Sequence, residues 1–357
     1  MRASMLEDHL NQVVGPRVPG LAVVIVGAEG VRAHAAAGVA DLSSGAPMTT
    51  HVAVPWFSMT KLVTATVAVK LASRGILPLD SPLLPLLPVM SCLRPAAWAA
   101  QITARHLLQH SAGLANPIPL AWIHPAAQPG PDPQEFLFTR LTKNPRLRSQ
   151  PGVRARYSNL GPLLLAAAVA QATGIRFEDV VHREVLQPTG MTRTDFGYPP
   201  DSPAATGNHP RTSPMRLLLP RWVRGDRHGS WLSLRPFLVD GAAYGGLVGS
   251  AEDAALFLRM HLADGRLDGR QVLAADDATE MRQISVHGRR YDHGLGWFTP
   301  SADPNHNPPF VEHLGGGAGF YNVMRLYPTL GVGAVVMGNA THYDIDTIAR
   351  LALTTTT

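Results

Sequence analysis

Ser58 and Lys61 are the residues of this chain whose types and spacing most directly suggest chemistry. They lie three positions apart in Ser58-Met-Thr-Lys61, inside the helix-like stretch 56–75. Residues i and i+3 lie on one face of a helix, so the serine hydroxyl and the lysine amine can share a hydrogen bond. A serine hydroxyl is too weakly acidic to attack a carbonyl at neutral pH without a neighbouring base. The spacing therefore indicates an activated, nucleophilic serine.

A second short motif, Tyr157-Ser-Asn159, adds a candidate acid or base and a candidate positioning group. The Tyr157 phenol has an ordinary pKa of about 10, too high for a base. A cation beside it, either Lys61 or a protonated His313, would favour the phenolate. The Asn159 amide offers a donor and an acceptor, which suits it to holding Lys61 and a substrate carbonyl together.

The third motif, His313-Leu-Gly315, opens a run of glycines. Glycine lets a strand backbone approach a ligand closely, because it has no side chain. One glycine N–H of this run, together with the N–H of Ser58, could form an oxyanion hole, worth roughly 3–4 kcal/mol per donor. Ser58 is expected at a helix N-terminus, where unpaired N–H groups favour developing negative charge.

The three motifs together resemble the serine β-lactamase and penicillin-binding-protein-like hydrolases. The most similar branch contains class C β-lactamases, DD-peptidases and family VIII carboxylesterases. Further ordered blocks carry the resemblance: Arg105–Leu114, Leu186–Met191, Gly245–Asp253 and His313–Phe320. The absence of a Gly-x-Ser-x-Gly elbow, a His-Glu-x-x-His motif and a phosphate-binding loop leaves competing mechanisms without support.

The resemblance implies a role for each motif residue. Ser58 would be the acylated nucleophile, and Lys61 and Tyr157 would form the general acid/base system. Asn159 would orient Lys61 and the substrate, and the N–H groups of Ser58 and Gly316 would form the oxyanion hole. Which group takes the serine proton stays open, as it does in related Ser-x-x-Lys enzymes.

His313 departs from the β-lactamase pattern, which has the lysine of Lys-Thr-Gly at this place and uses it to bind the β-lactam carboxylate. Histidine is largely neutral at pH 7, with an ordinary pKa of about 6.5. Anion recognition should therefore be weaker and pH-dependent. We expect a serine hydrolase that cleaves an ester or amide, with a carboxylesterase-like activity ranked first. The alternatives are a D-amino-acid-specific peptidase or weak β-lactamase, and a non-catalytic binding or assembly protein of the same fold.

The elements that position these residues follow from the same resemblance and from local patterns. The β-rich runs 20–27 and 31–39 predict a hairpin, residues 161–174 predict an apolar helix, and Ser250 predicts the N-cap of a following helix, with Asp253 at its third position. It implies an α/β fold of the α+β type, an antiparallel sheet flanked by helices with an inserted helical domain. We expect residues 1–75 and 248–357 to form the sheet domain, and 76–247 the helical domain, with the site between them. The Pro-, Arg- and Trp-rich segment 195–240 has weak periodicity and predicts a lid-like loop. Its large apolar residues would favour an apolar acyl or alcohol group: Met215, Leu217, Leu218, Leu219, Trp222 and Trp231.

Composition limits the remaining possibilities. The 357 residues carry a formal charge of +5, but the arginines are spread along the chain, so no nucleic-acid partner is predicted. A single cysteine, Cys92, excludes an intrachain disulfide, and the 15 histidines lack metal spacing, so neither metal nor cofactor is expected. Glu7 and Asp8 interrupt any signal-peptide core, which predicts a cytoplasmic protein. The apolar stretch Leu160–Ala170 is shorter than the roughly 18–20 residues that span a bilayer. The oligomeric state is not indicated.

Overall fold

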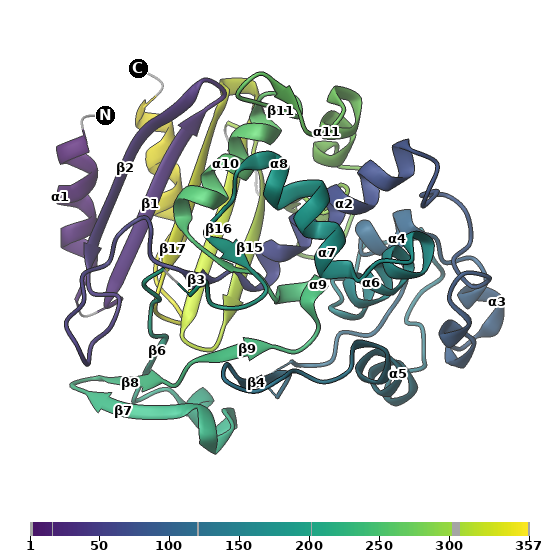
Figure 1. The fold of residues 1–357 in the computed structure, drawn as a ribbon, viewed down its shortest axis with the longest axis horizontal. Coiled ribbons are helices and arrows are strands. Elements are labelled where there is room, and N and C mark those ends of the chain that lie inside the picture. The colour runs from purple at the N-terminus through teal and green to yellow at the C-terminus, as the bar shows by residue number, and fades with distance from the viewer. Residues whose placement is uncertain (1–2, 16, 120, 201, 302–307, 356–357) are drawn as a thin grey trace.

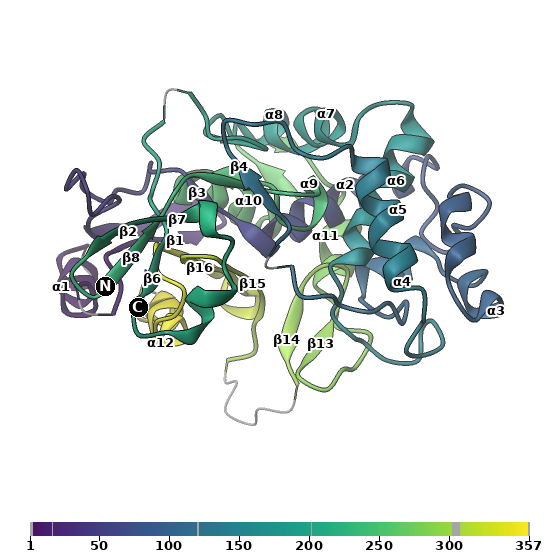
Figure 2. The same ribbon diagram turned by 90° about the horizontal axis from the view of Figure 1, so that it is seen from below.

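The computed structural model describes residues 3–15, 17–119, 121–200, 202–301 and 308–355, and a seven-stranded antiparallel sheet lies at its centre (Figure 1). The strand order is β13-β14-β15-β16-β17-β1-β2. In that order the strands are Tyr291–His293, Phe298–Pro300, Val311–Gly317, Phe320–Tyr327, Val332–Gly338, Gly20–Gly27 and Gly30–Gly38. The predicted hairpin of residues 20–39 is therefore confirmed as β1 and β2 at one edge of the sheet. Figure 2 shows β13 and β14 at the other edge.

Helices cover both faces of the sheet and make up most of the region beside it. The α-helices are α1 Ala3–Val13, α2 Thr60–Ser73, α3 Ala96–Ala99, α4 Ala104–Leu108, α5 Pro133–Lys143, α6 Leu160–Thr173, α7 Phe177–Val181, α8 Gln187–Thr189, α9 Ala242–Gly245, α10 Ala251–Leu262, α11 Ala275–Arg282 and α12 Ile345–Arg350. Shorter helical turns are η1 Phe57–Met59, η2 Pro88–Cys92, the π-helical η3 His182–Leu186, η4 Pro214–Leu218, η5 Arg221–Val223, η6 Pro328–Leu330 and η7 Leu351–Thr355.

Four small sheets in the described part of the chain lie outside the central seven-stranded sheet. Their strands are β3 Val54–Pro55, β4 Ile123–Pro125, β5 Thr194–Asp195, β6 Asn208–Pro210, β7 Arg224–His228, β8 Trp231–Leu234, β9 Phe237–Val239, β10 Val248–Gly249, β11 Arg266–Leu267 and β12 Arg270–Gln271. They pair as β3-β10-β5, β6-β8-β7, β4-β9 and β11-β12. The β3-β10 pair holds the segment that leads into the nucleophile helix.

Strand β1 shows why the central sheet is apolar on both faces. Val23 and Ile25 pack in the core formed with α1 and α12, whereas Val24 and Val26 point to the opposite face and the core that includes α2 and α10. Successive side chains of a strand alternate between faces, so a strand covered on both sides reads as a continuous apolar run. This burial accounts for Gly-Leu-Ala-Val-Val-Ile-Val-Gly in the sequence.

The predicted helices α2 and α6 are confirmed, and both are buried around most of their circumference. Each ends close to a glycine with a positive φ, 70° at Gly75 and 68° at Gly174. A glycine in the left-handed region ends a helix at little conformational cost. A helix that is apolar on all sides belongs in a core, which is where α2 and α6 lie.

Segment 195–240 differs from the expected long loop without clear elements. It contains the three strands β6, β7 and β8, two 3-10 turns, and β9. Trp231 is buried, whereas Leu217 and Leu218 are 65% and 58% exposed. The strands are only three to five residues long, and β7 is mostly polar, so period-2 alternation gives little signal.

The strands of the central sheet all come from residues 1–75 and 248–357, and helices α3 to α9 come from residues 76–247. The division of the chain into two such domains stays a prediction. Among the described residues, no single helix is long and apolar enough to cross a bilayer. The α6 helix and the following segment Phe177–Thr189 reach that length and composition only as a pair bent by 83°.

Candidate active site

Ser58 lies in the 3-10 turn η1, directly before α2, rather than inside the regular helix. The residue before it, Phe57, has a φ of 47°, in the left-handed region that bulky side chains rarely adopt. Such backbone strain persists only where the surrounding structure enforces it, and it concentrates at functional sites. Here β3 fixes one side of the turn and α2 the other, so the strained residue presents Ser58 at the start of the helix.

Lys61 follows one turn later and points back at the serine. Its Nζ donates hydrogen bonds to Ser58 Oγ at 3.0 Å and to the carbonyl oxygen of Tyr244 at 2.7 Å. The side chain is 3% exposed, and its hydrogen-bond partners among the described residues carry no charge. Burial therefore holds the pKa of Lys61 well below the ordinary lysine value.

Tyr157 approaches the same oxygen from the segment before α6. Its Oη donates to Ser58 Oγ at 2.7 Å, and Lys61 Nζ lies 5.0 Å from the centre of its ring. The expectation that a cation would favour the phenolate is wrong for this arrangement. Burial raises the pKa of Tyr157 and outweighs the opposing effect of the hydrogen bond with Ser58. The phenol therefore keeps its proton at neutral pH.

Asn159 lies beside this group, although its contacts differ from the expected ones. Lys61 is held by the Tyr244 carbonyl, and no hydrogen bond joins it to Asn159 among the described residues. The Asn159 backbone N–H donates to Asn116 Oδ1 at 3.1 Å, and the Asn159 Oδ1 atom is buried without a described partner. Asn159 is one of the residues that line the cavity at Ser58.

His313 lies behind Tyr157, with their ring centres 6.2 Å apart, and it does not line the cavity at Ser58. Its Nδ1 bonds with the Leu314 carbonyl oxygen at 2.8 Å, and its Nε2 is enclosed without a described partner. Burial, followed by the nearby charge of Lys61, lowers the pKa of His313 well below its ordinary value. A protonated His313 beside Tyr157 is therefore not supported. A role toward a substrate carboxylate stays a prediction.

Two glycines of the run in β15 lie directly against the turn that carries Ser58. A Cβ atom on Gly315 would lie 2.1 Å from the carbonyl oxygen of Trp56, and one on Gly317 would lie 2.0 Å from the Phe57 ring. These two glycines are thus needed to pack β15 against the turn that carries Ser58. Gly316 lies between them, is exposed, and lines the catalytic cavity together with Ser58.

The cavity at Ser58 has a volume of about 270 Å³ and an uncharged wall. Its apolar lining comes from Phe57, Pro119, Ile123, Val239 and Ala318. Its polar side chains are those of Ser58, Tyr157, Asn159 and Tyr244. Among the described residues of segment 195–240, only Val239 reaches this wall, so the described apolar residues that were expected to cover the site do not line it. The side chain of Met215 lies outside the described residues.

Tyr244 is the site residue that the motifs did not identify. It contributes a backbone carbonyl to Lys61 and its ring to the cavity, from the short helix α9. A carbonyl oxygen is common to all residues, so no side-chain type marks it. The sequence feature that could have indicated Tyr244 was its position directly before the Gly245–Asp253 block.

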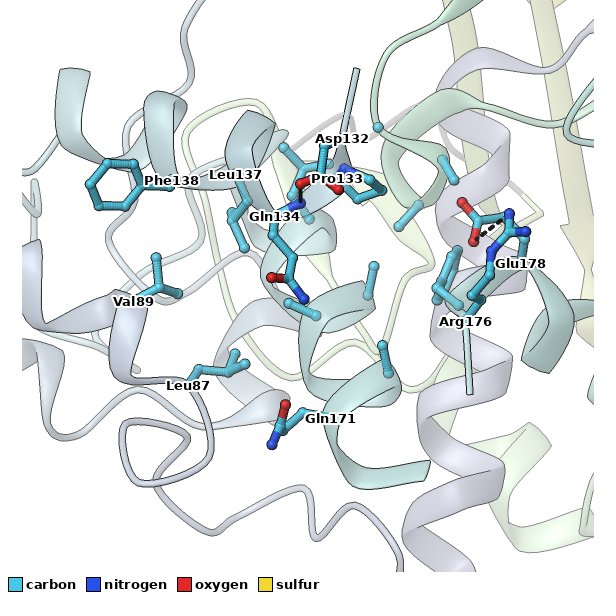
Figure 3. Close-up of a pocket in the computed structure, with 18 of the residues that line it drawn as sticks. Leu87, Val89, Asp132, Pro133, Gln134, Leu137, Phe138, Gln171, Arg176 and Glu178 are labelled. Carbon is cyan, nitrogen blue, oxygen red and sulfur yellow. Dashed lines mark hydrogen bonds and ion pairs between the residues drawn. The ribbon is translucent and has the colours of Figure 1, made fainter. Parts of the chain in front are cut away.

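A second, larger cavity lies on the other side of α9 (Figure 3). It measures about 790 Å³ and is lined mainly by apolar residues of η2, α5, α6 and α9, including Leu87, Leu137 and Leu163. Arg176 and Glu178 pair at 3.7 Å on one side of it. None of its described lining residues is a serine, lysine or histidine, whereas Ser58 lines the smaller cavity. No described group of three or more His, Cys, Asp or Glu side chains could hold a metal ion.

Comparison with known proteins relates the whole chain to one family. A family model described as Beta-lactamase matches residues 6–355. A D-alanyl-D-alanine-carboxypeptidase/endopeptidase, AmpH of Escherichia coli K12, is 26% identical over 301 residues, covering 78% of this chain and 69% of the relative. Esterase EstB of Burkholderia gladioli is 29% identical over 277 residues, covering 70% and 68%. The structure of D-amino acid amidase from Ochrobactrum anthropi SV3 matches with a TM-score of 0.79, at 22% identity and 98% coverage of both chains.

Proposed function

The chain belongs to the Beta-lactamase family, has its fold and is a serine hydrolase, and from that premise we propose that it hydrolyses a carboxylic ester through an acyl-Ser58 intermediate. One observation carries the proposal. Ser58 Oγ accepts hydrogen bonds from Lys61 Nζ at 3.0 Å and from Tyr157 Oη at 2.7 Å, on the wall of an uncharged, mainly apolar cavity. A nucleophile with a base and an acid in contact has what acyl transfer requires.

The two pKa shifts support a division of labour between Lys61 and Tyr157. Burial lowers the pKa of Lys61 and so favours its neutral form, and Lys61 is therefore assigned as the base that takes the Ser58 proton. A tyrosine with a raised pKa keeps its proton, so Tyr157 is assigned as the acid that protonates the leaving group. Acylation then leaves Lys61 protonated and Tyr157 as the phenolate; in deacylation Tyr157 takes a proton from the attacking water and Lys61 returns its proton to Ser58 Oγ.

The reaction then has two balanced steps. Ser58 Oγ bonds to the substrate carbonyl carbon while its proton moves to Lys61, and the oxyanion is stabilised by the N–H groups of Ser58 and Gly316. The ester C–O bond breaks, and the alkoxide takes a proton from Tyr157. A water molecule next attacks the acyl carbon and gives its proton to the acid/base pair. Ser58 leaves with its hydroxyl restored, and the carboxylic acid departs.

The wall of the cavity favours an ester with a short, uncharged acyl group. At about 270 Å³ it lies below the roughly 300–1,000 Å³ of pockets that enclose drug-sized ligands. No charged side chain is among its described lining residues, so a charged acyl group would lose its hydration without a partner. A D-amino-acid-specific peptidase or weak β-lactamase is ranked lower, because the acyl group of such a substrate carries an amine or carboxylate charge that this wall does not match.

A p-nitrophenyl ester series and a chromogenic cephalosporin test the proposal, with intact-mass detection of the acyl-enzyme. We expect turnover of acetate to butyrate esters and a mass increase equal to one acyl group, both abolished in Ser58→Ala. Ser73→Ala is the matched control, since Ser73 is an exposed serine at the far end of the same helix. Undiminished turnover in Ser58→Ala would refute the nucleophile assignment. Absence of acylation by either substrate class would favour a non-catalytic binding protein of the same fold.

A further inference from the structure

A recess of positive charge adjoins the catalytic cavity, and Tyr157 lines both. The recess has a volume of about 880 Å³, against about 270 Å³ for the cavity at Ser58. No aspartate or glutamate is among its described lining residues. Its cationic or titratable basic side chains are the exposed Arg154, Arg156, His287, Arg289 and Arg290 and the buried His293, whose pKa burial lowers to about 4.

A specific backbone pairing brings these residues together. The Ala155 N–H donates to the His287 carbonyl oxygen at 2.8 Å, and Ala155 forms a parallel bridge with Gly288. The arginines on either side of Ala155 therefore lie beside the basic residues that flank Gly288. A Cβ atom on Gly288 would lie 2.3 Å from the Tyr291 carbonyl oxygen and 3.1 Å from the Ala155 carbonyl oxygen, so glycine at this position permits both the turn to Tyr291 and the close approach of Ala155.

The charges of the recess are not neutralised within the described protein. All four arginines are exposed, and none has an ion pair or side-chain hydrogen bond among the described residues. The neighbouring acid, Asp292, is already engaged: it accepts hydrogen bonds from Ser301 Oγ at 2.6 Å and the Gly288 N–H at 2.9 Å, and lies 3.1 Å from His287 Nδ1. Like charges gathered in this way repel one another, and a bound anion would relieve that repulsion.

We propose that this recess binds a doubly charged anionic group, such as a phosphate or phosphonate, on the leaving group of the substrate. The inference rests on the proposed function, in which Tyr157 protonates the leaving group. That group must depart past Tyr157, and the recess lies at this residue. One guanidinium is enough to pair a carboxylate in two-pronged fashion, so four arginines match a group with more than one negative charge. The substrate is then bipartite, with a short apolar acyl group and an anionic alcohol.

Three butyrate esters of one nitrophenol test this assignment. The phenol carries a methyl ester, a carboxylate or a phosphonate at the same ring position, so the acyl group and the shape stay constant. We expect kcat/KM to rise from the methyl ester to the carboxylate to the phosphonate. The kcat/KM of the phosphonate should exceed that of the methyl ester by at least about tenfold at low ionic strength, which is the size of a few exposed ion pairs. This ratio should shrink in high salt.

Two double variants examine the two halves of the recess independently, in case one of them fails to fold. In Arg154→Gln/Arg156→Gln and in Arg289→Gln/Arg290→Gln, the preference for the phosphonate over the methyl ester should fall toward one. The matched control is Arg266→Gln on β11, an exposed arginine that does not line the recess, and it should keep the preference. A preference unchanged in both double variants would overturn the proposal.

The outcomes separate this inference from the proposed function. If the methyl ester is hydrolysed through Ser58 but the anionic esters gain nothing, the recess assignment is wrong and the proposed function stands. If no ester acylates Ser58, the proposed function fails, and calorimetric titration with inorganic phosphate decides the recess. Phosphate binding that the double variants lose would support an anion site. Binding of duplex DNA without phosphate binding would overturn it.

Discussion

The two ends of helix α2 each bury a lysine, and the two lysines have different partners. At one end, Lys61 Nζ contacts Ser58 Oγ at 3.0 Å and the Tyr244 carbonyl oxygen at 2.7 Å, both uncharged. At the other end, Lys70 Nζ lies 3.4 Å from a carboxylate oxygen of Glu184 and donates to the Glu184 carbonyl oxygen at 2.5 Å. The two residues are 3% and 8% exposed, so both are buried, and Lys61 is the more deeply enclosed.

The two ends of α2 differ in whether a carboxylate lies beside the buried lysine. Burial lowers the pKa of Lys61 well below its ordinary value, and no carboxylate opposes this. Burial also lowers the pKa of Lys70, but the negative charge of Glu184 raises it in part. Burial raises the pKa of Glu184, yet a hydrogen bond from Arg74 and the charges of Lys70 and Arg74 bring it below its ordinary value. Burial with an acid gives a structural ion pair, whereas burial without one gives a candidate base.

Lys61→Gln should produce the largest effect, because it removes the proposed base and keeps a polar side chain. We expect kcat/KM for a short ester to fall by about 10²–10⁴-fold, the usual contribution of general base catalysis. Lys70→Gln is the matched control on the same helix. Measured well below its melting temperature, it should keep kcat/KM within about twofold, since Lys70 contacts no residue of the catalytic cavity. Equal losses in the two variants would abolish the distinction between the ends of α2.

Glu184→Gln should produce the next largest effect, on stability rather than on activity. Glu184 is 4% exposed and is contacted by Lys70, Arg74 and Arg183, so its removal leaves buried positive charge unpaired. Breaking a buried pair from one side costs about 3–5 kcal/mol. We expect a loss of about 3 kcal/mol in the free energy of unfolding, measured by urea denaturation at pH 7. A loss below 1 kcal/mol would show that the pair does not stabilise the fold.

The sequence predicted the Lys61 end of this comparison and missed the Lys70 end. Ser58 and Lys61 are three residues apart on one helix, so local geometry alone brings them together. Tyr157 is 99 residues from Ser58 and was identified through the resemblance to a family. Glu184 is 114 residues from Lys70 in a stretch without a motif, and only the tertiary structure shows their contact.

The elements of the fold show the same difference between strong local patterns, which were predicted, and contacts between distant segments, which were not. The β1-β2 hairpin and the helices α2 and α6 have strong local patterns and were predicted, as was the capping of α10 by Ser250, whose hydroxyl accepts from the Asp253 N–H at 3.1 Å. Short strands such as β6 and β8 are stabilised by pairing across the fold, and their sequences carry little periodicity. The pairing of Ala155 with Gly288, which gathers the arginines, likewise depends on contacts between distant segments.

The activity should depend on pH, with kcat/KM falling on the acidic side. The proposed base acts when neutral, so kcat/KM should fall by about tenfold per pH unit below the lowered pKa of Lys61, and should be constant above it. Because this pKa is lowered and that of Tyr157 is raised, we expect a wide plateau between the two limbs. The measurement is a pH–kcat/KM profile with an uncharged ester. A profile that required a protonated lysine, falling as the pH rises through neutrality, would reassign the base.

Lys61→Met should have the smallest effect, a gain in stability. In wild type the folded-state pKa of Lys61 lies below the unfolded value of 10.5, so between the two the unfolded chain binds more protons. Wild-type stability therefore rises with pH through this window, and below the folded pKa the full cost of burying the charge remains. Replacing a buried charge by an apolar side chain is often neutral or stabilising by about 1–4 kcal/mol; we expect about 1 kcal/mol, because the Tyr244 carbonyl loses a donor.

The gain should shrink as the pH rises through 10.5, because only above this value is wild-type Lys61 neutral in both states. Urea denaturation of both proteins at several pH values measures it. Lys70→Met supplies the contrast, because it leaves the Glu184 carboxylate with fewer cations and should lower stability at neutral pH. A loss of stability in Lys61→Met equal to that in Lys70→Met would mean that Lys61 stabilises the fold as a charged group. It would then act in catalysis as a cation instead of a base, and the proton of Ser58 would have to pass to Tyr157.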